Sequence, residues 1–132
     1  SALSGPGGGD CCHNAKLIGP EPLQPDDFAY PIPYDLDSAG LVDAHYAVPP
    51  DGLPIRSVTQ RLFRGYCVHN DKLEETRKKF LASESDILAL IKNDTLLTSG
   101  TKKKASKYLE KFFQTLKNPD DFEKRVIQKC RK

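Results

Sequence analysis

The sequence predicts an all-α protein, in which a small antiparallel bundle of four to five short helices follows a largely irregular N-terminal arm. Glycine and proline occupy 16 of the first 55 positions but only 3 of the last 77. The later part also carries apolar residues at helical spacing, helix-start signals and short connections, which together favour a bundle. We therefore divide the chain into a flexible or extended, acidic, Pro-rich arm (1–55) and a helical domain (56–132).

Prolines spread along the arm exclude helices and central strands, because proline fixes φ and lacks a backbone donor. Extended or polyproline-like backbone is the expected conformation. The arm carries more aromatic residues than a solvated linker needs, and the candidates for contacts are Phe28, Tyr30, Tyr34 and Tyr46. We expect these rings either to pack on the helices or to anchor a partner. Tyr46 also stands in a Tyr-x-x-Pro pattern that phosphotyrosine-binding domains accept.

The first part of the helical domain contains one weak and one clear helical pattern. "SVTQRLFRG" (57–65) places apolar residues four apart, although its Val, Thr and Phe content also permits a strand. "NDKLEETRKKFLA" (70–82) has acidic residues four positions before lysines, which stabilises an exposed helix. We expect Asn70 or Asp71 to cap this helix.

The next segment, "SESDILALIKND" (83–94), predicts the central helix of the bundle. Ser83 and Asp86 have the spacing of a capping box, with Asp in the position usually held by Glu or Gln. The run of five apolar residues that follows goes all around a helix, which predicts burial on most sides. The chain then turns, and we expect Leu96 and Leu97 to face inward.

The most regular helical pattern lies in "TKKKASKYLEKFFQTLK" (101–117). One face carries Ala105, Tyr108, Leu109, Phe112, Phe113 and Leu116. The segment opens with three lysines, which a helix dipole disfavours in its first turn by a few tenths to about 1 kcal/mol each. Such an arrangement predicts an anion near the start of the helix, because backbone amides and lysines there bind phosphate or carboxylate.

The last segment, "NPDDFEKRVIQKCRK" (118–132), has a well-formed helix start. Asn118 is the predicted N-cap and Pro119 the first helical residue, and two acidic residues in the first turn suit the dipole. Phe122, Val126 and Cys130 form the expected buried stripe.

Charge is distributed unevenly along the chain. Residues 1–55 hold eight acids and one lysine, a net charge of −7, whereas residues 101–132 hold eleven bases and four acids, a net charge of +7. This asymmetry indicates an anionic partner for the basic end or an arm that folds back on it. The expected contact residues are Lys102, Lys103, Lys104, Lys107, Lys111, Lys124, Arg125, Lys129, Arg131 and Lys132.

The cysteines and histidines do not have the spacing of a disulfide framework, a zinc site or a catalytic site. Four scattered cysteines do not form the dense framework of a small secreted domain, so we expect reduced thiols in an intracellular protein, with the nucleus among its candidate locations. Cys11, Cys12, His13, Cys67 and His69 are soft ligands but lack zinc-site spacing. Cys67 and His69 lack the third group and oxyanion site of a nucleophilic enzyme. We expect no metal, no cofactor and no enzymatic activity.

Two functions remain. The first is a helical interaction module that binds acidic or aromatic protein segments in grooves lined by Leu88, Ile91, Tyr108 and Phe112, with the acidic arm as a built-in ligand. The alternative is a surface that binds DNA or RNA phosphates without reading sequence. No apolar run is long enough to span a membrane, so we expect a soluble chain without membrane contacts, and a monomer for this fragment.

Overall fold

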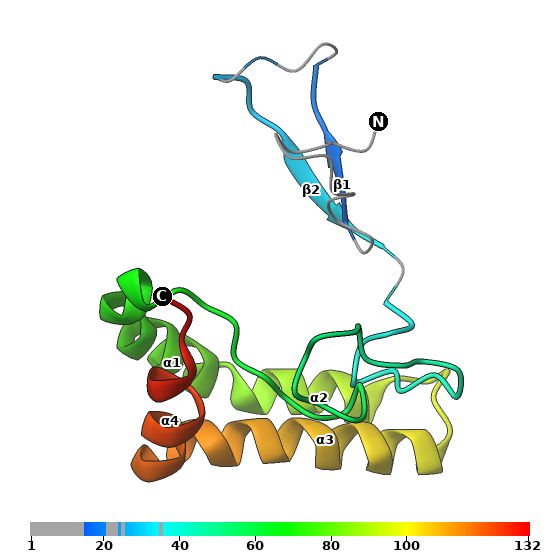
Figure 1. Ribbon diagram of the computed structural model, residues 1–132. Coiled ribbons are helices and arrows are strands. Elements are labelled where there is room, and N and C mark those ends of the chain that lie inside the picture. The colour runs from blue at the N-terminus through cyan, green and yellow to red at the C-terminus, as the bar shows by residue number, and fades with distance from the viewer. Residues whose placement is uncertain (1–14, 21–23, 25, 35) are drawn as a thin grey trace.

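The structure is a computed structural model that describes residues 15–20, 24, 26–34 and 36–132. The part of the chain that it describes is mostly helical after residue 66, as the sequence predicts (Figure 1). Among the described residues the α-helices are α1 (Leu73–Ala82), α2 (Glu84–Asn93), α3 (Ser99–Lys117) and α4 (Pro119–Arg125), and short 3-10 helices span Cys67–Lys72 and Ile127–Lys129. The antiparallel arrangement of a bundle stays a prediction, as does the division at residue 55.

The core is centred on α3, not on α2. Phe113 is only 1% exposed and clusters with Leu116 and Phe122, and apolar side chains of α1 and α2 pack against this cluster. The prediction that 83–94 forms the buried centre is wrong: α2 contains no buried residue, and Leu90 is 72% exposed. Figure 1 shows α2 lying along one side of α3, so only one face of its apolar run reaches the core.

Helix caps follow the prediction only where a helix starts from an extended residue. Asn118 caps α4, and its side chain accepts hydrogen bonds from the amides of Asp120 and Asp121 at 2.9 and 3.1 Å. The predicted cap of α1 is wrong, and the predicted cap of α2 is right in position but makes no side-chain capping hydrogen bond. The 3-10 helix Cys67–Lys72 runs directly into α1, so Asn70 and Asp71 are already helical. Ser83 joins α1 to α2, and its hydroxyl donates to the Lys79 carbonyl at 3.1 Å instead of capping.

The start of α3 differs from the prediction in a way that matters for its lysines. Thr98 is the N-cap, and its hydroxyl oxygen accepts a hydrogen bond from the Thr101 amide at 3.2 Å. The helix therefore begins at Ser99, and the three lysines lie in its second turn, beyond the free amides of the first. The preceding turn also departs from the prediction, because Leu96 is 92% exposed.

The segment from 36 to 66 forms turns that lie against α3. Residues 57–65 adopt neither the helix nor the strand that their spacing permits. Side-chain contacts hold this segment instead: the Arg61 guanidinium lies 3.8 Å from the centre of the Tyr108 ring and donates to the Tyr108 carbonyl. Gly40 lies so close to the Tyr108 hydroxyl that a Cβ atom at this position would overlap it.

Earlier in the arm, two short strands form an antiparallel hairpin. β1 (Ala15–Ile18) pairs with β2 (Tyr30–Pro33), and Ile18 is opposite Tyr30. Two prolines of β2 alternate with Tyr30 and Ile32, which is compatible with an edge strand because only every second residue donates to its partner. Figure 1 shows the hairpin standing away from the helices. None of the helices in the described part of the chain has the length and apolar character to cross a membrane.

Candidate functional site

A cleft of the described chain lies between the 61–63 segment, α3 and α4. Its volume is about 640 Å³, within the range of small-ligand and peptide-anchor pockets. Apolar side chains form much of its lining: Leu62, Phe63, Phe112, Leu116 and Val126. Its charged residues are Arg61, Lys111, Asp121 and Arg125. We call this site the basic cleft.

Aromatic packing holds the floor of the basic cleft in place. Phe112 packs edge to face with Phe80 of α1 and with Phe113 of the core, at ring-centre distances of 5.4 and 5.2 Å. Arg77 crosses from α1, donates to the Leu116 carbonyl at 2.5 Å and lies 5.2 Å from the Phe122 ring. The floor is therefore built on the most buried side chains of the described residues, which restricts its movement.

Positive charge prevails at the rim of the basic cleft. Arg125 is paired with Asp121, with 3.1 Å between its Nε and the carboxylate oxygen, so these two charges largely offset each other. Arg61 carries a second cation, and its guanidinium covers the Tyr108 ring. Within the described residues, no hydrogen bond or ion pair engages the exposed ammonium of Lys111. Neither Arg61 nor Lys111 is paired with a carboxylate of the described residues, so a ligand in the basic cleft would meet two cations without a partner acid.

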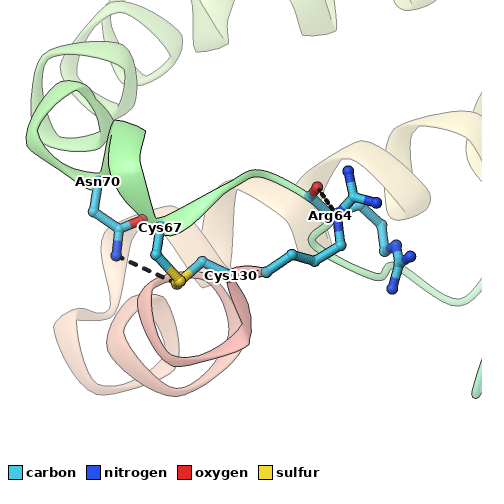
Figure 2. The surroundings of a disulfide bond; sticks show 5 residues. Arg64, Cys67, Asn70 and Cys130 are labelled. Atoms are coloured by element: carbon cyan, nitrogen blue, oxygen red, sulfur yellow. Dashed lines mark hydrogen bonds between the residues drawn. A yellow bond between two sulfur atoms is a disulfide. The ribbon is translucent and has the colours of Figure 1, made fainter. Parts of the chain in front are cut away.

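A disulfide joins the chain just after the 61–63 segment to the C-terminal segment (Figure 2). It joins Cys67 to Cys130, whose Cα atoms are 5.0 Å apart. The expectation of reduced thiols is therefore wrong for these two residues. Sequence spacing could not show the pairing, because 63 positions separate the partners.

Backbone hydrogen bonds continue the connection on both sides of the disulfide. The Cys67 amide donates to the Arg131 carbonyl and the Arg131 amide donates to the Gly65 carbonyl, each at 2.8 Å. The Arg131 side chain donates to the Arg64 carbonyl at 2.8 Å, and its guanidinium lies 4.3 Å from the Tyr66 ring. Figure 2 shows Arg64 beside this C-terminal segment. Residues 64–67, which follow the 61–63 segment, are thus fixed to the C-terminal segment.

The disulfide also bears on the chemistry considered from the sequence. Cys67 has no thiol to act as a nucleophile with His69. Asn70 lies against the bridge, and its amide donates to the sulfur of Cys130 at 3.6 Å (Figure 2). No group of three potential metal ligands occurs among the described residues, and Cys11, Cys12 and His13 lie outside them.

The predicted anion-contact lysines are distributed over several environments. Lys104 forms an ion pair with Asp43 of the arm, with 2.6 Å between Nζ and Oδ2. Lys102 donates to the Lys92 carbonyl at 3.0 Å, close to the C-terminal end of α2 where a cation is favourable. Lys103 lines a second groove between α2 and α3, of about 420 Å³. Two of the three opening lysines therefore have partners within the chain.

The other predicted cations are partly exposed and partly engaged. Arg125 and Arg131 make the contacts described above. The exposed remainder consists of Lys107, Lys111, Lys124, Lys129 and Lys132. The basic cleft brings together only Lys111 and Arg125 of the predicted set.

The four predicted groove residues do not share one groove. Phe112 lines the basic cleft and Leu88 lines the groove between α2 and α3. Tyr108 is covered by Arg61, and Ile91 is half-buried on α2.

The predicted arm aromatics remain largely exposed. Phe28 and Tyr30 pack edge to face at 5.3 Å and are 77% and 62% exposed. Tyr34 follows β2 and is also exposed. The hydroxyl of Tyr46 donates to Asp37 at 2.8 Å.

Sequence reasoning missed the residues that complete the basic cleft from the 61–63 segment. Arg61, Leu62 and Phe63 belong to a stretch whose weak helical spacing permitted a helix that does not form, so the sequence did not place them at a cleft. Asp43 is one of eight acids in the arm, and local sequence does not show which of them reaches α3. Comparison of the chain with protein-family models, with curated proteins and with solved structures finds no match.

Proposed function

We propose that this chain is a non-enzymatic protein-interaction module whose basic cleft binds acidic segments that carry an aromatic anchor. The observation that carries the proposal is the combination, in one cleft, of an aromatic and aliphatic floor with two uncompensated cations. Aromatic anchors in desolvated pockets dominate many interfaces, and complementary charge at the rim selects and steers the partner. An acidic segment with an aromatic side chain has both properties.

We propose that the arm is itself a ligand of the neighbouring surface of α3. Asp43 pairs with Lys104, and the turn at Gly40 lies directly on Tyr108. Both contacts support this proposal, because they join the acidic arm to the basic helix. Because the Lys104 side chain is largely exposed, the ion pair contributes at most about 1 kcal/mol, which makes this segment displaceable.

The disulfide changes the compartment that we propose. Disulfides persist in oxidising environments and are rare in the cytosol and nucleus. The intracellular and nuclear expectation depended on reduced cysteines, which Cys67 and Cys130 are not. We therefore propose that the interaction takes place in an oxidising compartment.

A peptide titration tests the proposal. A fluorescent peptide with the sequence of residues 26–37, DDFAYPIPYDLD, is titrated with the full oxidised chain and followed by anisotropy. Lys111→Glu is expected to weaken binding by about tenfold or more, because it reverses a charge at the rim. Lys124→Glu is the matched control, since Lys124 is exposed but does not line the basic cleft. Equal affinity for the two variants would reject the basic cleft as the site.

A separate variant tests the built-in ligand. Asp43→Ala in the full chain removes the contact with Lys104, which lies outside the basic cleft, so it is expected to shift the amide resonances of α3 around Lys104 and Tyr108 and to leave the peptide affinity unchanged. Unshifted resonances would show that the arm is not a ligand of this part of α3.

Nucleic-acid binding remains the alternative proposal, and the exposed lysines of α3, α4 and the C-terminus support it. Binding to phosphates predicts an affinity for a mixed-sequence oligonucleotide that falls steeply with salt, with a slope that reports the number of contacts. In this case Lys124→Glu should weaken binding as much as Lys111→Glu. Negligible binding at low salt would remove this alternative.

A further inference from the structure

The hairpin of the arm exposes an apolar surface that nothing in the described chain covers. Phe28, Tyr30 and Ile18 are each at least 60% exposed, and the first two rings form an edge-to-face pair. The hairpin stands away from the helices in Figure 1. Contiguous apolar side chains on a projecting element are typical of interaction surfaces.

Charge makes this surface complementary to the basic cleft. Residues 24–37 contain four acids and no base. Asp26 and Asp27, which are exposed, directly precede Phe28. The basic cleft offers Arg61 and Lys111 around an aromatic floor. The hairpin presents an aromatic pair beside carboxylates, and the basic cleft is an aromatic-lined cavity beside cations. The two surfaces are therefore complementary.

The hairpin does not reach the basic cleft of its own chain in this structure. The arm is fixed to the first half of α3, where Asp43 contacts Lys104 and Gly40 contacts Tyr108. The basic cleft lies at the second half, around Phe112 and Leu116. From Lys104 to Leu116 an α-helix rises by about 18 Å, and Figure 1 shows the hairpin pointing away from α3. Binding within one chain would require the hairpin to turn back toward α3 from this position.

In a pair of chains, the hairpin of each copy can bind the basic cleft of the other while the arm keeps its contacts with α3. We infer that the hairpin of one copy binds in the basic cleft of another, with Phe28 and Tyr30 on the floor and Asp26 and Asp27 near the cations. Reciprocal exchange gives a closed dimer with two equivalent contacts. This inference rests on the proposed function, because it uses the same cleft and names its partner.

Sedimentation equilibrium of the full oxidised chain tests the inference. The chain is expected to form a concentration-dependent dimer. Phe28→Ala/Tyr30→Ala and Lys111→Glu should each weaken dimerisation by about tenfold or more, a factor that corresponds to about 1.4 kcal/mol. Asp26→Lys/Asp27→Lys is a second hairpin variant, since it changes exposed charges outside the strands. Val48→Ala and Lys124→Glu, at exposed positions outside both surfaces, should leave the dimer intact.

Mixing separates exchange between chains from other modes of association. A hairpin variant keeps a normal cleft, and the Lys111→Glu variant keeps a normal hairpin, so an equimolar mixture should form heterodimers through one contact. In mixtures of isotope-labelled and unlabelled parent chain, nuclear Overhauser effects are expected between the Phe28 or Tyr30 ring of one chain and Phe112 of the other.

Two results would overturn the inference. One is a monomer at every concentration up to about 1 mM, since even a millimolar dissociation constant would then show as a dimer. The other is contact of the hairpin with its own cleft, seen as effects within one chain that persist on dilution. Either result leaves the proposed function standing if the DDFAYPIPYDLD peptide still binds and Lys111→Glu weakens it. Loss of peptide binding as well would reject both.

Discussion

Single side chains cap the starts of α3 and α4. Asn118 and Thr98 precede α4 and α3 in extended conformation, and each accepts a hydrogen bond from an otherwise unpaired amide of the first turn. Ser83 has the same chemistry but follows a helix directly, so its hydroxyl donates to the Lys79 carbonyl. The capping role of a residue therefore depends on the backbone before it as well as on its own side chain.

Asn118→Ala is expected to lower the free energy of unfolding by about 1 kcal/mol, because it leaves the amides of Asp120 and Asp121 without their partner. Urea denaturation followed by circular dichroism measures the change. Ser83→Ala is the matched control and should have a smaller effect, since this serine caps no amide. A larger loss for Ser83→Ala than for Asn118→Ala would contradict the assignment of the caps.

Among the elements, α3 organises the rest of the molecule. Its Phe113 and Leu116 meet Phe122 of α4, and apolar residues of α1 and α2 pack around them. The other surfaces of α3 receive the arm at Lys104 and Tyr108 and form the floor of the basic cleft. One helix thus connects the core with both candidate contact regions.

Phe113→Ala is expected to destabilise the protein by about 3 to 5 kcal/mol, because it leaves a cavity at the most buried position described. Leu90→Ala, in the helix predicted to be central, should change stability by no more than about 0.5 kcal/mol, since this side chain is largely exposed. Denaturant titrations of both variants compare the two values. Similar losses would show that α2, and not only α3, is part of the core.

At the scale of the whole molecule, a disulfide links the start of the helical region to the C-terminus. It closes a loop that includes all four described α-helices. Small helical domains have little core to stabilise them, and this chain has few fully buried side chains among its described residues. A covalent link of this span is therefore a major source of stability.

Replacing both partners, Cys67→Ser with Cys130→Ser, is expected to lower the free energy of unfolding by about 4 kcal/mol, the loop-entropy value for a closure of this length. The 61–63 segment, which lines one side of the basic cleft, should also become more mobile, so the affinity for the peptide should fall. Denaturation and the anisotropy titration measure the two effects. A change in stability below about 1 kcal/mol would show that the disulfide does not constrain the unfolded chain as proposed.

The sequence by itself determined the features that depend on local chemistry. Prolines kept helices out of the arm, the Asn-Pro-Asp-Asp start specified the beginning of α4, and periodic apolar residues identified α3. Each of these signals acts through the backbone or one helix face within a few residues. Charge asymmetry indicated either an anionic partner or an arm that folds back, and it did not identify Asp43 as a contact of Lys104.

Only the tertiary structure decided which distant residues meet. Cys67 pairs with Cys130, and Arg61 contacts Tyr108 from a segment that forms neither helix nor strand. It also decided that α3, and not the more apolar α2, forms the centre of the core. Such choices depend on the combined packing of all elements, because burial is a property of a position in the fold rather than of a short sequence. The basic cleft arises from these long-range contacts, which is why local patterns found only part of it.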